Sequence, residues 1–252
     1  IEGVLWGSRR LVGGRCHLIF EHLSFRNSGV HGYQDCGVSN VTIRACNFRH
    51  IGGAVWNREL RIRFGNAIEF WDGATDIVVE DCTFDDIYDS GVTHQGGENR
   101  NIPRRLRFQR NVFDRCGMAA YECREPSSEI SFEHNICRNA GCGFSMLGVV
   151  GPRQSEIHPM PMGHHIFVWR IDPGTQPGPV YIRHNTFSES PNGSAIFSII
   201  DPVDERWLIL DHNTYQQTKG NGLIRLGGCD YAPSDFQRYQ QTTGQDRNSR
   251  LL

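Results

Sequence analysis

The chain has 252 residues, 38% of them hydrophobic, and a formal net charge of −2. That length suffices for one large domain with a sizeable core. Because the charge is close to zero and no long run of one sign occurs, composition gives no reason to expect a nucleic acid or an anionic membrane as partner. No apolar run approaches the ~18–20 residues needed to cross a bilayer.

One pattern of alternating apolar and polar residues recurs along the chain and usually closes on an aromatic ring. Period-two alternation predicts a strand with one buried face. A repeat of roughly 20–30 residues predicts the coils of a solenoid, with insertions in the longer intervals. The seven copies are Leu18–Phe25, Val41–Phe48, Ile77–Phe84, Leu106–Phe113, Ile130–Cys137, Val180–Phe187 and Leu208–Tyr215.

Two positions before the closing residue, four successive copies carry Asn. This column reads Leu23, Cys46, Cys82, Asn111, Asn135, Asn185 and Asn213. It predicts an internal asparagine ladder at a bend between strands, because stacked amides can hydrogen-bond to the coils above and below. Cys is small enough to occupy the same slot.

The repeat resembles that of the right-handed parallel β-helix family, the pectate-lyase-like fold, over about residues 16–228. The resemblance implies an all-β chain folded as a single-stranded right-handed parallel β-helix of about seven to nine coils. The stretch Ile68–Gly96 is similar to a recurring segment of bacterial carbohydrate-active β-helix proteins, which implies a polysaccharide or oligosaccharide substrate. For a protein acting on such polymers, a secreted or periplasmic location is favoured, although no signal peptide is visible.

In chain order, residues 1–17 are expected to cap the open end of the stack, because an exposed end would offer unpaired strand edges. Coils follow to residue 228, enlarged by insertions near Trp56–Phe64 and Gly148–Gly163. The β-helix domain is therefore expected to span residues 1–228. Residues 229–252 contain few apolar residues, so a short cap followed by disorder is expected there.

Metal and cofactor chemistry is not indicated. The nine Cys residues include no spacing typical of zinc, and mostly reduced, buried thiols are expected. Acidic pairs at Glu80-Asp81 and Asp85-Asp86 could suggest calcium. Adjacent carboxylates on a strand point in opposite directions, however, so no metal site is predicted there.

Each coil has a further strand after its turn, and these strands predict one functional face. If Ile68 and Val92 point inward, Glu69 and Trp71 point outward. The register of the fourth coil leaves either Tyr121 or Glu122 outward, and Glu122 is favoured because an unpaired carboxylate inside a narrow solenoid is costly. Glu69 and Glu122 then lie two coils apart, with backbones about 9–10 Å from each other.

Two carboxyl groups roughly 6.5–9.5 Å apart suit inverting glycoside hydrolysis, in which one protonates the leaving oxygen and the other activates water. Glu69 and Glu122 are the predicted catalytic pair, and His94 and Asp89 are added as groups that adjust the pKa of a carboxylic acid. The alternation itself points His94 inward, which leaves a core role open. The predicted substrate-binding residues are Trp71, Asp72, Gln95, Tyr121, Arg124, His165 and Trp169.

Two other classes remain open. A polysaccharide lyase or uronate epimerase needs a base and a cation that neutralises the uronate. Because Lys219 is the only Lys, the base would be a His, Tyr or Arg. His94 or Tyr121 could act as the base, with Arg124 as the cation. A non-catalytic glycan-binding or structural β-helix is the third class, although it would need neither the insertions nor the grouped polar residues. The oligomeric state is not indicated.

Overall fold

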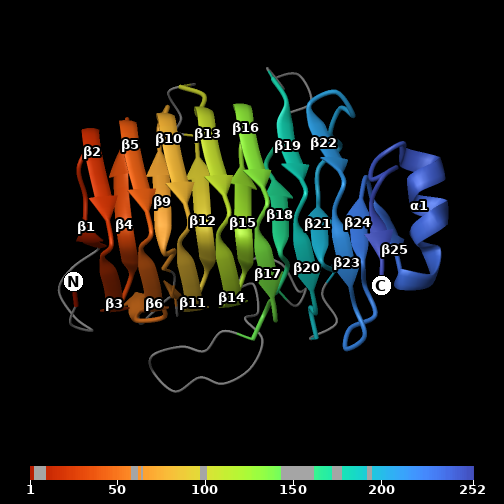
Figure 1. Ribbon diagram of the computed structural model, residues 1–252, viewed down its shortest axis with the longest axis horizontal. Coiled ribbons are helices and arrows are strands. Elements are labelled where there is room, and N and C mark those ends of the chain that lie inside the picture. Colours follow the sequence, from red (N-terminus) through yellow and green to blue (C-terminus); the bar gives the residue numbers. More distant parts are fainter. Residues whose placement is uncertain are drawn as a thin grey trace.

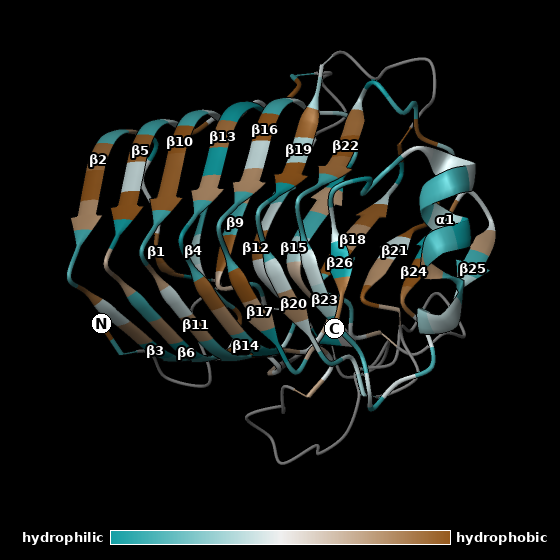
Figure 2. Cartoon of the chain, turned by 45° about the vertical axis from the view of Figure 1, so that its right-hand side comes forward, coloured by the Kyte–Doolittle hydropathy of each residue, from teal (hydrophilic) through white to brown (hydrophobic). Residues whose placement is uncertain are grey.

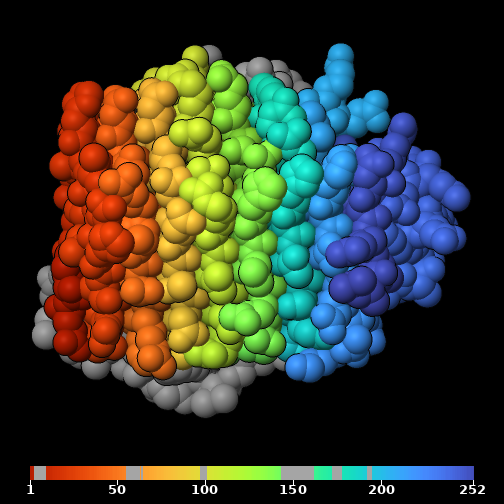
Figure 3. Space-filling view, in the orientation of Figure 1, coloured from red at the N-terminus to blue at the C-terminus, as the bar shows by residue number. Residues whose placement is uncertain are grey.

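The computed structural model describes residues 1–2, 10–57, 62–63, 65–96, 101–142, 162–171, 178–191 and 195–252. Its strands stack into three parallel sheets that wrap around one core (Figure 1). Successive coils lie against each other as bands along the long axis (Figure 3). This is the predicted right-handed parallel β-helix, and its seven-stranded sheet agrees with the predicted number of coils.

The nine-stranded sheet carries the candidate site. In spatial order its strands are β1 (Arg10–Val12), β4 (His31–Cys36), β9 (Ile68–Trp71), β12 (Ser90–Gln95), β15 (Ala119–Arg124), β18 (Ile166–Trp169), β21 (Phe197–Ile199), β24 (Ile224–Leu226) and β25 (Cys229–Tyr231). All neighbours are parallel except β24 and β25, which pair antiparallel and close this sheet.

The other two sheets complete each coil. The seven-stranded sheet contains β2 (Cys16–Glu21), β5 (Ser39–Arg44), β10 (Thr75–Glu80), β13 (Arg104–Gln109), β16 (Ser128–Glu133), β19 (Val180–Arg183) and β22 (Leu208–Asp211). The eight-stranded sheet contains β3 (Ser24–Ser28), β6 (Asn47–Ile51), β11 (Thr83–Ile87), β14 (Val112–Cys116), β17 (Ile136–Arg138), β20 (Thr186–Ser188), β23 (Thr214–Gln216) and β26 (Arg250–Leu251).

Each aligned segment proves to be two strands joined by a corner. The corner residue adopts a left-handed conformation, with φ between 50° and 58°, at His22, Ala45, Asp81, Arg110, His134, His184 and His212. One such residue turns the chain from the seven-stranded to the eight-stranded sheet. Buried residues alternate with more exposed ones in strands such as β5 and β13. Figure 2 shows hydrophobic segments in all three sheets.

The predicted asparagine ladder is confirmed at this corner. The backbone N–H of Cys82 donates to Asn111 Oδ1 at 2.9 Å. Asn111 donates in the same way to Asn135, and Asn135 to Asn185, each at 2.9 Å. Asn185 completes the series by donating to Asn213 at 3.0 Å. Each buried amide therefore satisfies a backbone donor that the turn removes from the sheet ladders.

Aromatic rings fill the space beside the ladder. Phe25 and Phe48 stack with centroids 4.5 Å apart, and Phe84 and Phe113 do the same. All four are at most 1% exposed. Burying one such side chain contributes about 1.5–3 kcal/mol, so this column, repeated once per coil, is a major source of stability.

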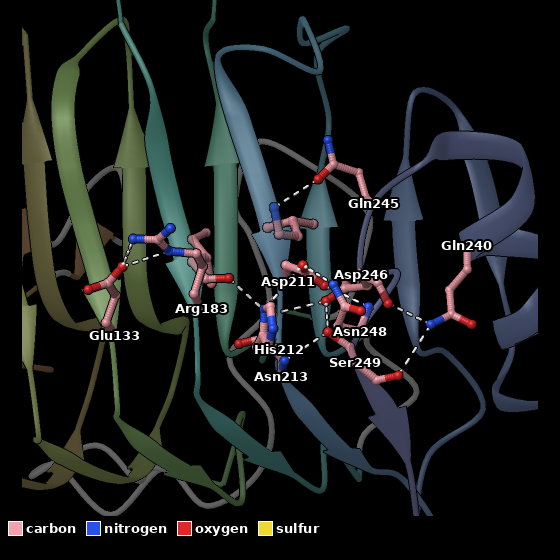
Figure 4. Close-up of polar contacts among 12 residues, drawn as sticks. Glu133, Arg183, Asp211, His212, Asn213, Gln240, Gln245, Asp246, Asn248 and Ser249 are labelled. Atoms are coloured by element: carbon pink, nitrogen blue, oxygen red, sulfur yellow. Dashed lines mark hydrogen bonds and ion pairs between the residues drawn. The ribbon is translucent and has the colours of Figure 1, made fainter.

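The C-terminal segment is an ordered cap, so the disorder expected there is wrong. It contains β25, a 3₁₀ turn (Pro233–Asp235), α1 (Phe236–Thr243) and β26, which pairs with β23. Fully buried Asp246 accepts hydrogen bonds from Asn213, Tyr215, Tyr239 and Ser249. Asn213, Asp246 and Ser249 meet between the last coil and the cap (Figure 4). Few apolar residues suffice because this buried polar network is fully paired.

Two predicted insertions fall largely outside the described residues. The first contributes a short hairpin, β7 (Val55–Asn57) and β8 (Ile62–Arg63). The second, near Gly148–Gly163, lies almost wholly outside the described part of the chain. So does Gly143–Gly148, the segment of the fifth coil that would be its further strand after the turn. The strand that fills the fifth-coil position in the nine-stranded sheet is β18.

All nine cysteines are free thiols. Within the described residues, no three His, Cys, Asp or Glu side chains are grouped so as to hold a metal ion. The acidic pairs considered for calcium instead contact arginines: Arg110 binds Glu80 at 2.7 Å and Asp81 at 2.9 Å. In the same described part of the chain, no helix is both long and apolar enough to span a membrane.

Candidate active site

The register of the nine-stranded sheet aligns two outward-facing columns. In the carboxylate column, Glu69 pairs with Thr93 and Thr93 pairs with Glu122. The tryptophan column, two residues further along each strand, contains Trp71, Gln95, Arg124 and Trp169. The structure thus has the register that was favoured from the sequence, with Glu122 outward and Glu69 two strands away.

The same register turns two predicted site residues into the core. Tyr121 and His94 are both 0% exposed, and the Tyr121 hydroxyl lies 2.7 Å from His94 Nε2. Burial lowers the pKa of His94 to about 3 and raises the pKa of Tyr121 well above its usual value. Because side chains alternate along a strand, an outward Glu122 excludes an outward Tyr121. Tyr121 therefore does not provide the sugar platform expected of it.

His165 also lies inside the coil rather than on the outer face. It is 1% exposed, and its Nε2 lies 3.1 Å from the carbonyl oxygen of Ser188. Burial lowers its pKa to about 4. Its ring packs 5.8 Å from that of Phe187 in the core. The structure does not bring His165 to the carboxylates.

Glu69 is held as an ionised carboxylate. Burial alone raises its pKa, but the positive charge of His31 and hydrogen bonds from His31, Asn66 and Trp71 outweigh burial, so the pKa is lowered. His31 Nδ1 lies 2.8 Å from Glu69 Oε2, and Asn66 Nδ2 donates to the same oxygen at 3.0 Å. The Trp71 indole N–H donates to the other oxygen.

The pKa of Glu122 is displaced in the opposite direction from that of Glu69. Burial raises its pKa to about 7, the hydrogen bond from Trp169 opposes that rise, and the negative charges of Asp89 and Glu69 add to it. Trp169 Nε1 donates to Glu122 Oε1 at 2.7 Å, and Ser90 Oγ lies 3.4 Å from Oε2. Glu122 is 2% exposed. Near neutral pH a large fraction of this side chain therefore carries a proton.

Asp89 and Thr93 lie close to this pair. Asp89 accepts the Gly65 backbone N–H at 2.9 Å and is 3% exposed, so it acts on Glu122 as a nearby buried charge. Thr93 lies between the two carboxylates. Its buried hydroxyl makes no hydrogen bond of normal geometry with the described residues, although it is close enough to Glu122 to favour the charged form.

Arg124 fills the tryptophan column. Its guanidinium lies 5.6 Å from the ring centre of Trp71 and 5.1 Å from that of Trp169, and it donates to Gln95 Oε1. Burial lowers its pKa. The two indole rings are held by cation–π contact with Arg124, while their N–H groups donate to Glu69 and Glu122. Trp71 and Trp169 thus position the carboxylates.

Asp72 follows β9 at the edge of this group. It has φ of 48°, is partly exposed, and its Oδ1 makes no hydrogen bond with the described residues. Together with Gln95, which is 7% exposed, it continues the polar rim next to Trp71. These two remain predicted substrate-binding residues.

Sequence reasoning missed His31, Asn66 and Ser90. His31 belongs to β4, which pairs with β9, so it approaches Glu69 from the preceding coil. The stacking that paired Glu69 with Glu122 could have identified it, since β4 was expected to be a strand of the first coil. Asn66 and Ser90 stand where the chain enters β9 and β12. Nothing in the alternation shows that residues at such corners turn toward the face.

Fold and site together define a single-stranded right-handed parallel β-helix with a polar outer face. The family model for the right handed beta helix region matches residues 10–151, more than half of the chain. The chain belongs to this family, whose domain often occurs in carbohydrate-active proteins. No curated protein and no solved structure matches the chain.

Proposed function

We propose that this protein is a polysaccharide-cleaving glycoside hydrolase in which Glu122 is the general acid and Glu69 the general base. One observation carries the proposal: two buried carboxylates of one column have pKa values displaced in opposite directions. Such divergence supplies an acid and a base at the same pH. Because Glu122 has a pKa of about 7, it can donate a proton to a leaving oxygen near neutral pH.

The spacing favours inversion of the anomeric centre. Glu69 and Glu122 flank one intervening strand, which separates their backbones by about 9.6 Å. With both side chains projecting in parallel from their strands, the carboxyl groups would lie about this far apart, close to the upper end of the roughly 6.5–9.5 Å that leaves room for a water molecule in inverting enzymes. The ionised Glu69 would accept the proton of that water while Glu122 protonates the departing glycosidic oxygen.

The lyase and epimerase alternative is less well supported, because both residues considered as its base face the core. His94 and Tyr121 bind each other there. A neutral, fully buried phenol or imidazole of this kind cannot reach a proton beside a uronate carboxylate on the outer face. Arg124 faces outward, but its guanidinium lies against both indole rings and donates to Gln95, so these contacts compete with a role as base or as uronate-neutralising cation.

The test is hydrolysis of a polysaccharide panel by the wild type and by Glu69→Gln and Glu122→Gln. The wild type should release reducing ends, and each variant should release them roughly 10²–10⁴-fold more slowly. Glu129→Gln, at an exposed site on β16, is the matched control and should keep full activity. Product NMR should show the inverted anomer.

Three results would overturn the proposal. Unsaturated products detected by ultraviolet absorbance would identify a lyase. Both Gln variants keeping wild-type activity would remove the carboxylate pair from the mechanism. Binding of a glycan by the wild type with no cleavage of any member of the panel would favour the non-catalytic module.

A further inference from the structure

A cavity of about 240 Å³ lies further along the sheet that carries the carboxylates. Its lining residues are Met162, His164, Phe167, Ser198, Ile200, Arg225 and Gly228. Phe167 pairs directly with Glu122, Ser198 with Phe167, and Arg225 with Ser198. The cavity therefore continues the carboxylate column across β18, β21 and β24, which follow β15 in Figure 1.

The cavity contains buried polar groups suited to a hydroxylated ligand. Ser198 is 0% exposed, and its Oγ has no hydrogen-bond partner within the described residues. Leaving a buried hydroxyl unpaired costs about 1–3 kcal/mol, and a bound ligand would remove that cost. His164 Nδ1 lies 2.7 Å from the carbonyl oxygen of Ala195, which only accepts. Nδ1 therefore carries the proton, and Nε2 of the neutral ring is an acceptor.

Its other walls are apolar and aromatic. The Phe167 ring stacks on His164 at 5.5 Å and on Trp169 at 5.7 Å. Met162 and Phe167 belong to one buried cluster on this outer side of the sheet. A flat aromatic wall with a few convergent polar groups is typical of sites that bind a sugar ring. This aromatic row also links the cavity to Trp169, which donates to Glu122.

The charge of the cavity is balanced. Arg225 Nε contacts Asp230 Oδ1 at 2.6 Å, and its Nη2 lies 3.3 Å from the other oxygen. Burial favours the neutral form of His164. A ligand carboxylate would have to compete with Asp230 for the guanidinium. The lining thus favours an uncharged ligand.

We propose that this cavity is a subsite for one neutral sugar ring of the chain whose glycosidic bond lies at Glu122. The inference rests on the proposed function, since it assigns the substrate class of that site. A volume of 240 Å³ lies below the roughly 300–1,000 Å³ of sites for drug-sized ligands, so it suits a single ring. Ser198 and His164 would bind its hydroxyls and Phe167 its apolar face.

The test is binding without turnover. Methyl glycosides of neutral hexoses and pentoses, and of glucuronic and galacturonic acid, are titrated into the Glu122→Gln variant by saturation-transfer NMR. At least one neutral glycoside should bind, and it should bind more tightly than either uronide. Tighter binding of a uronide, or no binding of any neutral glycoside, would overturn the proposal.

Variants then locate the binding. Ser198→Ala removes one hydrogen bond and should weaken binding about 3- to 10-fold. Ile200 is 38% exposed at this cavity, so Ile200→Trp should block the opening with little risk to folding. Ser131→Ala, in a cavity on the seven-stranded sheet, is the matched control and should leave binding unchanged. Unchanged binding to both cavity variants would place the ligand elsewhere.

The two proposals can fail separately. If neutral glycosides bind at this cavity but Glu122→Gln retains full hydrolytic activity, the catalytic assignment is wrong and the subsite stands. If Glu122→Gln abolishes hydrolysis while no neutral glycoside binds, the catalytic assignment stands and the subsite is wrong.

Discussion

The pKa of Glu122 can be moved in either direction by changing one neighbour, and hydrolysis should follow it. Trp169 lowers this pKa by donating to the carboxylate at 2.7 Å, whereas the charge of Asp89 raises it. Trp169→Phe should therefore raise the pKa above about 7. Asp89→Asn should lower it while keeping an oxygen that can accept the Gly65 N–H.

The size of the first shift follows from the hydrogen bond. A hydrogen bond to a charged group contributes about 1.5–3 kcal/mol. Because one pKa unit corresponds to 1.36 kcal/mol, Trp169→Phe should raise the pKa of Glu122 by about one to two units. Wild-type kcat/KM should fall about tenfold per pH unit above pH 7, where the general acid loses its proton. In Trp169→Phe this decline should begin at correspondingly higher pH.

The assay is the pH dependence of kcat/KM for the wild type and both variants, with the cleaved polysaccharide as substrate. The opposite signs make the two variants controls for each other, since general damage to the site would not move the alkaline limb in both directions. Shifts of the same sign, or an alkaline limb that stays in place, would refute the assignment of Glu122 as the general acid.

Three further results are expected. His31→Gln removes the imidazole whose interactions lower the pKa of Glu69, so that pKa should rise and the acid limb of the pH profile of kcat/KM should move to higher pH. Folding raises the pKa of Glu122 from 4.5 to about 7, so its contribution to stability is present below the lower value and lost as pH rises through the upper one. The free energy of urea unfolding of Glu122→Gln should therefore exceed that of the wild type by about 3 kcal/mol at pH 8 and equal it at pH 4. Asn185→Ala removes the amide that accepts the Asn135 N–H and donates to the Phe132 carbonyl, so it should lower the unfolding free energy by about 3 kcal/mol. Asn47→Ala at an exposed position should cost less than about 1 kcal/mol.

The fold could be predicted because each coil repeats the same pattern of two strands joined by a corner. Alternation fixes which side chains face the core, and the amide column fixes where the chain turns. The Asn111 to Asn213 ladder follows directly from that column. The ordered cap could not be predicted, because its stability depends on Asp246 meeting partners from the last coil, from α1 and from the C-terminal segment itself. A composition poor in apolar residues does not reveal a buried polar network.

The site could be predicted only in part, for a related reason. Stacking in register makes Glu69 and Glu122 neighbours on one face, and that much follows from strand periodicity. Their protonation does not follow from it. It depends on the two indole N–H groups and on His31, which approaches from another coil. Tyr121 was predicted to bind the substrate because its ring suits a sugar. The strand register that turns Glu122 outward turns Tyr121 into the core, so that prediction was wrong.

The contrast with three arginine-paired carboxylates on or beside the seven-stranded sheet supports a functional role for Glu122. Asp81 is paired with Arg110, Glu133 with Arg183 and Asp76 with Arg105, at 2.6–2.9 Å. Such pairing keeps acidic side chains ionised at little cost. Glu122 instead receives an indole N–H, and Asp89 lies close enough to oppose its ionisation.

Arginine pairing recurs on the neighbouring sheet, and the buried structural carboxylate Asp246 instead accepts hydrogen bonds from four side chains. Glu122 follows neither pattern, because it accepts from Trp169 and Ser90 while the charges of Asp89 and Glu69 oppose its ionisation. Burial of Glu122 lowers the free energy of unfolding by about 3 kcal/mol at alkaline pH. Proteins tolerate such a loss mainly at sites where it serves chemistry. A buried acid poised to release its proton near pH 7, beside a partner held ionised, is the feature on which the hydrolase proposal depends.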